Sequence, residues 1–307
     1  MPKLLVTGAN GHLGRRLIRA LPEDWTIVAA VRSERAQRLL ERHVGPRPGL
    51  DIVRTDPRDP AALAAAGSGA AAAVHLIGTI KETRDNRYAD SHERPAEALA
   101  AAASQAGFCH IVYLSILGAS AHSTSRCLRA RAAVEDILRA AGMPATVIRV
   151  PMVIGEGDRA TGALARRAAA QRVFLYRAAS LEQPIYAGDV ITALVAACSP
   201  TPSSSATYDL AGPESLARRQ LVLRAAATLG RQPHVYSLPL ALGLAVAGLM
   251  ERLVANPPVT RDMLQVLDHD DAIDPGPAAA ALGVTLTPLD TLLERCVGAR
   301  RDQLTGR

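Results

Sequence analysis

The chain has 307 residues, of which 49% are hydrophobic and 21% charged, a composition typical of globular proteins that excludes an intrinsically disordered chain. The net charge of +6 comes mostly from arginines spread along predicted helices, and no basic run interleaved with aromatic residues predicts a nucleic-acid surface. No Cys-x-x-Cys pair or Cys/His cluster occurs, which argues against a zinc site or a disulfide framework, since the cysteines are widely spaced: Cys109, Cys127, Cys198 and Cys296.

Short apolar runs alternate with helical patterns over the first 150 residues. Strands are predicted at 3–7, 25–31, 50–55, 71–77, 110–115 and 145–150, with helices at 12–21, 33–43, 59–66, 91–106 and 126–141. Strands that alternate with helices indicate βαβ units and a parallel sheet covered by helices on both faces. We therefore expect an α/β fold, a doubly wound Rossmann domain, over residues 1–150.

The regular alternation of strands and helices ends after residue 150. Helical patterns near 160–171, 188–199, 215–229 and 238–254 are separated by short extended pieces. This predicts a smaller mixed lobe on the substrate side, residues 151–307, with segments such as 188–199 packing back on the sheet.

Three features bear on location. The N-terminus runs directly into a strand-like segment, which leaves no room for a signal peptide. Because the widely separated cysteines fit a reducing compartment, a cytoplasmic protein is expected. The apolar stretch at 238–250 is too short to span a bilayer, so no transmembrane segment is expected. We expect this stretch to form a buried helix, with docking onto a membrane or a protein partner as the alternative.

A glycine-rich turn, TGANGHLG at 7–14, joins the first predicted strand to the first helix. Gly8 permits the tight turn, Gly11 lets the backbone approach a pyrophosphate, and Gly14 allows the helix to pack closely on the strand. Because the helix N-terminus then faces the negative charge, the turn predicts a dinucleotide-binding site.

The end of the second predicted strand bears on which dinucleotide binds. NAD-specific sites usually place an acidic residue there for the ribose 2′-hydroxyl, whereas this chain has Arg32, Ser33 and Arg35, with its first carboxylate at Glu34. Guanidinium groups suit a 2′-phosphate because they offer it bidentate charge-assisted bonds. We therefore expect NADP(H) to be preferred and NAD(H) to be possible; the alternative is that these arginines merely begin an exposed helix.

The Gly-x-x-Gly-x-x-Gly spacing resembles that of the short-chain dehydrogenase/reductase superfamily, in its extended and atypical branches. Further motifs follow in the family's order: RTDPRD (54–59), VHLIGT (74–79), VYLSILGAS (112–120), RVPMVIGEGD (149–158) and LEQPIYAGDVITAL (181–194). Within the superfamily the chain is most similar to the group around the 39-kilodalton NADH dehydrogenase subunit and to NmrA-like proteins. The resemblance implies that the cofactor is lined by Thr7, Gly8, Asn10, Gly11, His12, Leu13, Gly14, Asp56, Pro57, Leu76, Ile77, Gly78, Arg131, Pro151 and Val153.

Active members of the superfamily begin the helix after the serine strand with Tyr-x-x-x-Lys. The tyrosine exchanges a proton with the substrate oxygen, and the lysine holds the nicotinamide ribose. This chain has Cys127 and Arg131 at those positions. Arg131 would still bond a ribose hydroxyl but cannot relay a proton, and the Cys127 sulfur stops short of where a phenolic oxygen would lie. The ordinary ketone–alcohol mechanism is therefore expected to be impaired, and a small buried residue is the alternative explanation of Cys127.

Other side chains are candidates for a replacement acid. Ser115 occupies the family's catalytic serine position and would polarise a substrate oxygen. His122 in the following loop and Lys81 after the fourth strand are further candidates, with a solvated surface role as the alternative for His122. Tyr113 shares a face with Ser115 and is expected to pack deeper, while Tyr186 and Asp189 are expected to be structural: both lie in the QPIY turn region.

Three functions fit these features. The first, which we favour, is an NADPH-dependent reductase of a small organic substrate. Such an enzyme would either use an unusual proton donor or transfer its hydride to an activated double bond. The second is a redox-silent cofactor-binding assembly or sensor protein, with residues 238–254 as a candidate partner surface. The third is non-redox isomerisation, elimination or cyclisation in the same cleft.

Overall fold

The structure is a computed structural model that describes residues 2–83, 86–198, 204–254, 257, 259–266 and 269–300. The chain divides into two compact units, one formed by Met1–Arg149 with Ile191–Tyr208 and the other by Val150–Val190 with Asp209–Arg307. Each unit has its own hydrophobic core.

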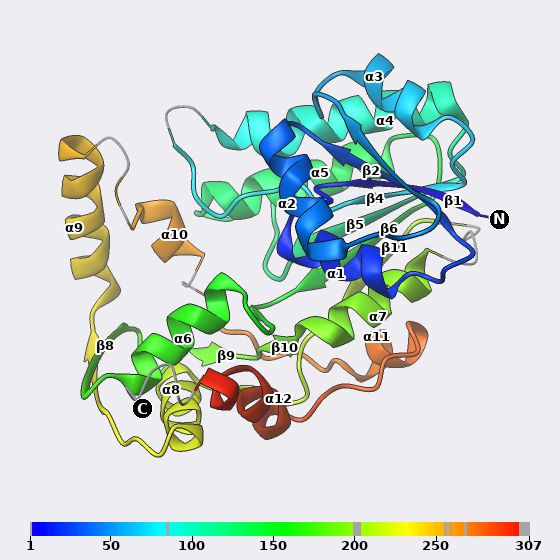
Figure 1. The fold of residues 1–307 in the computed structure, drawn as a ribbon. Helices are drawn as coiled ribbons and strands as arrows, with labels where there is room; N and C mark the ends of the chain where they lie inside the picture. The colour runs from blue at the N-terminus through cyan, green and yellow to red at the C-terminus, as the bar shows by residue number, and fades with distance from the viewer. Residues whose placement is uncertain are drawn as a thin grey trace. The chain divides into compact units, whose positions relative to one another are not determined.

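A seven-stranded sheet is the centre of the first unit (Figure 1). Its strands lie in the order β11-β6-β5-β4-β1-β2-β3. Their bounds are β1 (Lys3–Thr7), β2 (Thr26–Val31), β3 (Leu50–Arg54), β4 (Ala72–His75), β5 (His110–Ile116), β6 (Ala145–Val150) and β11 (Ala206–Asp209). Strands β1 to β5 pair in parallel, and the order reverses between β1 and β4. The prediction of a doubly wound parallel sheet is confirmed.

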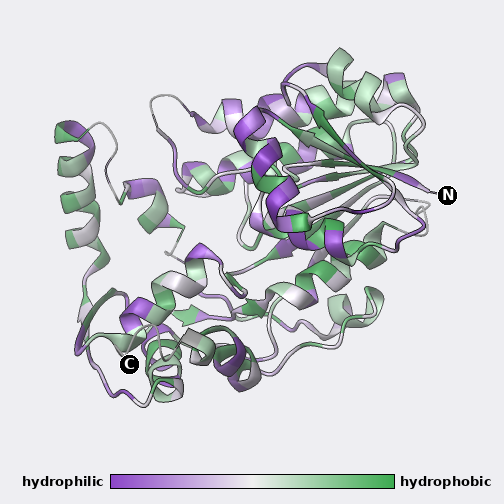
Figure 2. Ribbon diagram, viewed as in Figure 1, coloured by the Kyte–Doolittle hydropathy of each residue, from purple (hydrophilic) through white to green (hydrophobic). Residues whose placement is uncertain are grey.

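Helices cover both faces of this sheet, with α3, α4 and α5 on one face and α1 and α2 on the other (Figure 1). Their bounds are α1 (His12–Ala20), α2 (Glu34–Val44), α3 (Pro60–Gly67), α4 (Arg94–Ala106) and α5 (Arg126–Arg139), with a π-helical turn η1 (Ala89–Glu93) leading into α4. Strands β1, β2, β4 and β5 are apolar and almost wholly buried, as parallel strands covered on both faces must be. Figure 2 shows these strands mostly in green, the colour of hydrophobic residues.

The chain returns to the first unit after residue 190. Helix α7 (Ala187–Ala197) contributes its residues from Ile191 onward, and β11 then adds the last strand of the sheet. Ser205, just before β11, accepts a hydrogen bond from the backbone N–H of Ala145 at 3.0 Å. Strand β11 did not emerge from the sequence pattern, because an edge strand of four residues lacks a continuous apolar run.

The second unit combines short strand pairs with helices. The pairs are β7 (Val153–Ile154) with β10 (Ile185–Tyr186), β9 (Leu181–Glu182) with β12 (Leu216–Ala217), and β8 (Arg172–Tyr176) with β13 (His234–Leu238). The helices are α6 (Arg159–Ala169), α8 (Arg218–Thr228), α9 (Leu240–Leu253), α10 (Arg261–Gln265), α11 (Gly276–Ala281), α12 (Leu289–Cys296) and the 3₁₀ turn η2 (Gly298–Arg300). Packing of α6, α8 and α12 around buried leucines forms its core.

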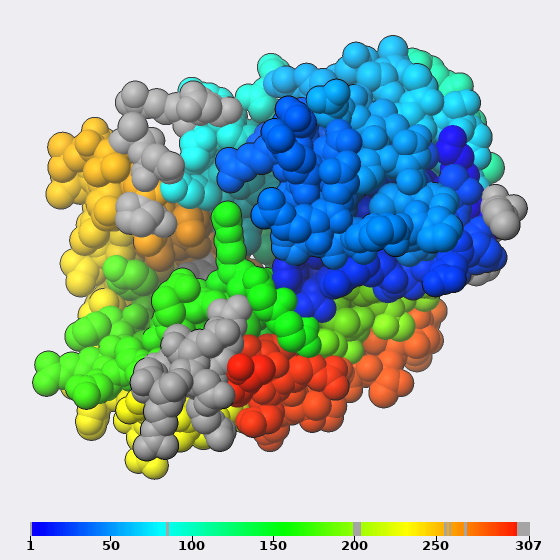
Figure 3. Space-filling model, viewed as in Figure 1, coloured from blue at the N-terminus to red at the C-terminus, as the bar shows by residue number. Residues whose placement is uncertain are grey.

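The prediction of a buried helix at 238–250 is wrong. Helix α9 forms there, but its large side chains face solvent, with Leu242 51%, Val246 46% and Leu249 58% exposed. Only its small residues Gly243, Ala247 and Gly248 are buried. The golden side chains of α9 lie at the molecular surface in Figure 3. No helix in the described part of the chain is long and apolar enough to cross a membrane.

Candidate dinucleotide-binding site

The glycine turn between β1 and α1 is shaped by close backbone contacts. Gly8 has φ of +73°, and a Cβ there would lie 2.8 Å from the carbonyl carbon of Leu76 at the end of β4. A Cβ on Gly14 would lie 2.6 Å from the Gly8 carbonyl oxygen and 2.7 Å from that of Ala9. These positions therefore require glycine, because only a residue without Cβ lets the turn close against β4 and α1.

The N-terminus of α1 places the backbone amides of its first turn next to the glycine turn. The first helical hydrogen bond runs from Arg15 N to Gly11 O at 3.1 Å, so the amides of His12, Leu13 and Gly14 precede it. Gly11 caps the helix without a side chain, and the first turn carries no acidic residue. Backbone amides together with the positive end of the helix dipole fit the diphosphate of a dinucleotide, which these residues would hold.

The turn after β2 carries positive charge and one carboxylate directed away from it. Arg32 and Arg35 are exposed and have no hydrogen-bond or ion-pair partner among the described residues. Ser33 caps α2 by accepting a hydrogen bond from Ala36 N at 3.3 Å. Glu34 pairs along the helix with Arg38 at 3.3 Å. The guanidinium groups of this turn are therefore available to an anionic ligand.

The turn after β3 contains an internal ion pair. Arg58 donates from Nε and Nη2 to the two carboxylate oxygens of Asp56, at 3.0 and 2.8 Å. These hydrogen bonds lower the pKa of the Asp56 carboxyl. Asp56 thus orders its own turn, followed by the half-buried Pro57, and its contact with an adenine ring remains a prediction.

The Cys127 and Arg131 side chains both turn inward on α5. The Cys127 thiol is fully buried and donates to the Thr79 carbonyl at 3.6 Å. Arg131 Nη1 donates to the Tyr113 hydroxyl at 3.0 Å and to the Leu114 carbonyl at 3.2 Å. Gly78 leaves room for this guanidinium, because a Cβ there would lie 2.4 Å from Arg131 Nη2. The resulting cluster lies beside the β4 turn that includes Leu76 and Ile77.

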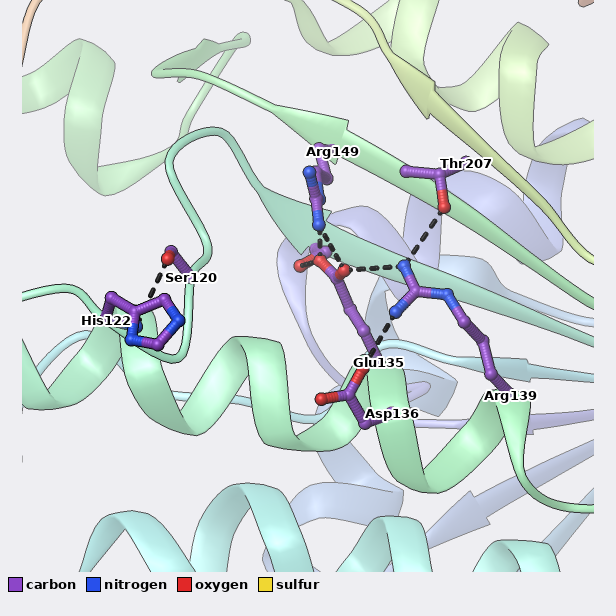
Figure 4. A network of polar contacts seen from close by, with 8 residues as sticks. Ser120, His122, Glu135, Asp136, Arg139, Arg149 and Thr207 are labelled. Atoms are coloured by element: carbon purple, nitrogen blue, oxygen red, sulfur yellow. Dashed lines mark hydrogen bonds and ion pairs between the residues drawn. The ribbon is translucent and has the colours of Figure 1, made fainter.

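Ser115 belongs to a buried charge network that the sequence did not reveal. Figure 4 shows Glu135, Arg139 and Arg149 of this network. The Ser115 hydroxyl donates to Glu135 Oε1 at 2.6 Å. The Glu135 side chain is 1% exposed and also accepts from Arg149 Nη2 at 2.6 Å and Arg139 Nη2 at 2.8 Å. Because a hydroxyl has one proton to donate, the bond to Glu135 leaves Ser115 Oγ with only lone pairs for any further contact.

The remaining candidates lie apart from this network. His122 is exposed in the loop after β5, where its backbone N–H bonds Ser120 Oγ at 3.2 Å (Figure 4). The Lys81 backbone N–H bonds Thr79 Oγ1 at 3.2 Å. In the second unit, Tyr186 donates to Glu156 at 2.7 Å, and Asp189 accepts from Thr287 N and Oγ1, both at 2.8 Å. Pro151 and Val153 also belong to the second unit, and their part in a cofactor site remains a prediction, as does that of Asn10.

Two buried histidines near the glycine turn were missed by sequence reasoning. His75 on β4 lies with Nδ1 2.8 Å from Thr7 Oγ1, and His92 on η1 has Nε2 3.1 Å from Thr79 N and 2.8 Å from Thr79 O. Both are fully buried. A histidine inside an otherwise apolar strand, as in AAAVHLI, was the available signal for His75.

Comparison with known proteins decides the family. A model of the NAD(P)H-binding family matches residues 8–173. The chain belongs to this family. The motifs predicted a dinucleotide-binding protein, and membership of this NAD(P)H-binding family confirms that prediction.

The curated relatives of this NAD(P)H-binding protein include subunits of a mitochondrial NADH dehydrogenase and a reductase. It is 30% identical to subunit 9 of the mitochondrial NADH dehydrogenase 1 alpha subcomplex of Arabidopsis thaliana, over 86% of this chain and 67% of that one. It is 27% identical to the mouse subunit, over 93% of this chain and 77% of that one. It is 30% identical to a ceramide reductase of Caulobacter vibrioides, over 80% and 76%.

Solved structures share the fold at low identity. The NADPH-dependent quinone oxidoreductase of Escherichia coli, solved with NADPH, is 20% identical and has a TM-score of 0.72 over 95% of this chain and 98% of that one. The enzyme WbmH of Bordetella bronchiseptica, solved with NAD⁺, is 17% identical with a TM-score of 0.71 over 98% and 99%. At these identities the likeness concerns the fold.

The buried histidines of this NAD(P)H-binding protein predict a loss of stability in mild acid. Burial, with the charge of Arg131, lowers the pKa of His75 and of His92 to about 3 each. The folded pKa lies below the unfolded value of about 6.5, so the stabilisation is complete above pH 6.5 and is lost as the pH falls towards 3. We expect the free energy of unfolding in urea to fall by about 1.4 kcal/mol per pH unit for each histidine below pH 6.

A histidine variant isolates this effect. His75→Asn keeps an acceptor near Thr7 and should remove about a third of the histidine-dependent slope between pH 6 and pH 5. His92 supplies a second third, and His110, whose pKa burial lowers to about 4, supplies the remainder. His122→Asn, which changes an exposed histidine, is the control and should leave the slope unchanged. An unchanged slope in His75→Asn would contradict the assignment.

Proposed function

We propose that this protein binds NADP(H) and holds it without turning it over, so that the loaded fold serves an assembly or a sensing role. The observation that carries the proposal is the engagement of the side chains at the family's catalytic positions. The Ser115 hydroxyl donates to Glu135, the Cys127 thiol to the Thr79 carbonyl, and the Arg131 guanidinium to Tyr113 and Leu114.

Because these side chains already donate their hydrogen bonds within the protein, they are poorly placed to give a proton to a substrate. When bound, the nicotinamide supplies or accepts a hydride. A carbonyl oxygen that gains charge would then need a proton or a strong donor. Ser115 offers such an oxygen lone pairs, and Arg131 keeps its protons at any physiological pH. The relatives that are subunits of NADH dehydrogenase support a role within an assembly.

The preference for NADP(H) rests on the β2–α2 turn. Arg32 and Arg35 are exposed there, while Glu34 is paired with Arg38. A 2′-phosphate in this turn would contact the two guanidinium groups. The Glu34 carboxylate would not repel it strongly, because Arg38 neutralises that charge. The half-buried proline and the Asp56–Arg58 pair of the next turn would form the adenine side of the site.

A titration tests the proposal. Calorimetry with NADPH and NADH should show one site and tighter binding of NADPH. The protein loaded with NADPH should keep its absorbance at 340 nm when mixed with ketones, aldehydes, enones and iminium compounds. Steady oxidation of NADPH by any of them would refute redox silence while leaving the binding site intact.

A charge reversal tests the specificity. Arg32→Glu combined with Arg35→Glu should weaken NADPH binding by at least about 100-fold, because each lost charge-assisted bond contributes about 1.5–3 kcal/mol. The double variant should leave the NADH affinity within about threefold of the parent. Arg42→Glu, which reverses an exposed charge later on the same helix, is the control and should change neither affinity. Equal loss for NADPH and NADH would show that these arginines do not read the 2′-phosphate.

A reductase is the second candidate function. The ceramide reductase of Caulobacter vibrioides, 30% identical over 80% of this chain, favours it. The geometry restricts such a reductase to a substrate that needs little help from a phenol, such as an activated double bond or an iminium. The panel of compounds above decides between the two candidates.

A further inference from the structure

Exposed apolar side chains gather on one part of the second unit. They lie on α9, on the residue that follows it, and on the β8–β13 pair that leads into it: Phe174, Tyr236, Leu242, Val246, Leu249, Leu253 and Val254. Their exposed fractions run from 43% for Val254 to 76% for Leu253. We call these residues the α9 surface. Apolar surface concentrated in this way marks an interaction site.

Helix α9 has its large apolar side chains on the outward face, whereas such side chains usually face the protein core. Leu242, Val246, Leu249 and Leu253 follow one another at spacings of four, three and four, which places them on one helix face. The opposite face packs on the protein through glycines: a Cβ on Gly243 would lie 2.7 Å from the Tyr176 ring, and one on Gly248 would overlap the Arg261 guanidinium. The small residues thus face inward and the large apolar residues outward.

The aromatic pair is continuous with this helix. Phe174 and Tyr236 stack with ring centroids 5.2 Å apart, at paired positions of β8 and β13. Arg172, Phe174 and Tyr176 alternate along β8 and therefore share one face of it. Helix α9 covers Tyr176 at Gly243, whereas Phe174 stays 59% exposed. The aromatic pair and α9 therefore lie on the same side of the strand pair.

Positive charge borders the apolar residues. Arg166 and Arg167 of α6, with Arg172 and Phe174 of β8, line a hollow of about 390 Å³. None of these three arginines has an ion-pair partner among the residues that the structure describes. Burial lowers the pKa of Arg167, and the like charges of Arg218 and Arg166 lower it further. The hollow is therefore suited to an anionic group.

We propose that the α9 surface docks on an anionic phospholipid bilayer, with the outward face of α9 among the acyl chains and with Arg166, Arg167 and Arg172 on lipid phosphates. Helix α9 has 14 residues and a length of about 21 Å, so it would lie along the interface. Aromatic rings between an apolar face and a charged rim match the layered polarity of a lipid interface. The carboxylate of Glu251 on α9 is engaged with the protein, because it accepts a hydrogen bond from Arg261 N.

Vesicle flotation tests this proposal with the full chain. We expect the protein to float with vesicles of phosphatidylglycerol and phosphatidylcholine at low salt, and binding to fall at least tenfold with pure phosphatidylcholine. The single variants Arg166→Glu and Arg172→Glu should each bind the anionic vesicles about fivefold more weakly than the parent. Arg42→Glu is the control for charge and should bind vesicles as the parent does. Inorganic phosphate at about 10 mM should not displace the protein from the vesicles.

The apolar contribution has a matched pair of variants. Leu242→Asp with Leu249→Asp should abolish flotation, and Leu223→Asp, on the exposed part of α8, should retain it. Circular dichroism should show both variants folded, because all three leucines are at least 38% exposed. In Val246→Trp, anionic vesicles should shift the tryptophan emission to the blue, and brominated acyl chains should quench it.

Other outcomes overturn the proposal. If the parent fails to float at low salt, or if Leu242→Asp with Leu249→Asp floats equally well, no lipid site exists on this surface. If sedimentation shows a dimer that the double aspartate variant dissociates, and vesicles do not compete with it, the surface pairs with a second copy. Dinucleotide binding is measured separately, so neither result bears on the proposed function.

Discussion

Gly8→Ala is expected to abolish dinucleotide binding. Alanine at φ of +73° is strained by about 1–2 kcal/mol, and its Cβ would lie 2.8 Å from the Leu76 carbonyl carbon and 2.9 Å from its oxygen. Because those atoms are backbone, the turn must shift away from β4 and carry the amides of α1 with it. Loss of two charge-assisted bonds would weaken NADPH binding by about 100-fold or more, as measured by calorimetry.

Gly45→Ala provides a matched control. Gly45 has nearly the same φ, +74°, but no atom lies within 4 Å of an added Cβ. We expect this variant to lose about 1–3 kcal/mol of unfolding free energy and to bind NADPH as the parent does. If both variants bind equally weakly, the effect comes from general destabilisation and not from the glycine turn.

Glu135→Ala should strongly destabilise the first unit. It removes the carboxylate that accepts hydrogen bonds from Ser115, Arg139 and Arg149 and leaves partly buried guanidinium charge without its partner. Breaking a buried ion pair in this way costs about 3–5 kcal/mol. Chemical unfolding in urea at pH 7 measures the change.

Asp136→Ala is the natural comparison, because Asp136 contacts the same Arg139 at 3.0 Å but is 73% exposed. An exposed ion pair contributes about 0–1 kcal/mol, so this variant should be nearly as stable as the parent. Comparable losses in the two variants would show that burial of Glu135 does not matter.

Acid should weaken the Glu135 network in a defined range. Burial alone would raise the pKa of Glu135, but hydrogen bonds from Arg149 and Ser115 lower it overall. A lowered pKa means that the stabilisation is present above the unfolded pKa of about 4.3 and is lost as the pH falls through the folded value. This loss lies at lower pH than the onset of the histidine effect, and it should be absent from Glu135→Gln.

Much of the fold and part of the site could be predicted from local sequence. The βαβ rhythm is visible because parallel strands buried on both faces need continuous apolar runs, such as KLLVT and TIVAAV. The turn at Gly8, Gly11 and Gly14 is visible because backbone geometry there depends on the residue itself and its near neighbours. The absence of the Tyr-x-x-x-Lys pair was likewise apparent from Cys127 and Arg131 alone.

Tertiary structure alone decided which partners those residues have. Ser115 bonds a glutamate 20 positions later, and that glutamate is held by Arg149, 14 positions further on. An apolar run shows that α9 is a helix, but only packing on Tyr176 and Arg261 turned its glycines inward and its leucines outward. Hydrogen-bonding needs and hydrophobicity are properties of single residues, whereas the atoms that satisfy them are brought together by the whole chain, so these contacts have no signature in a local pattern.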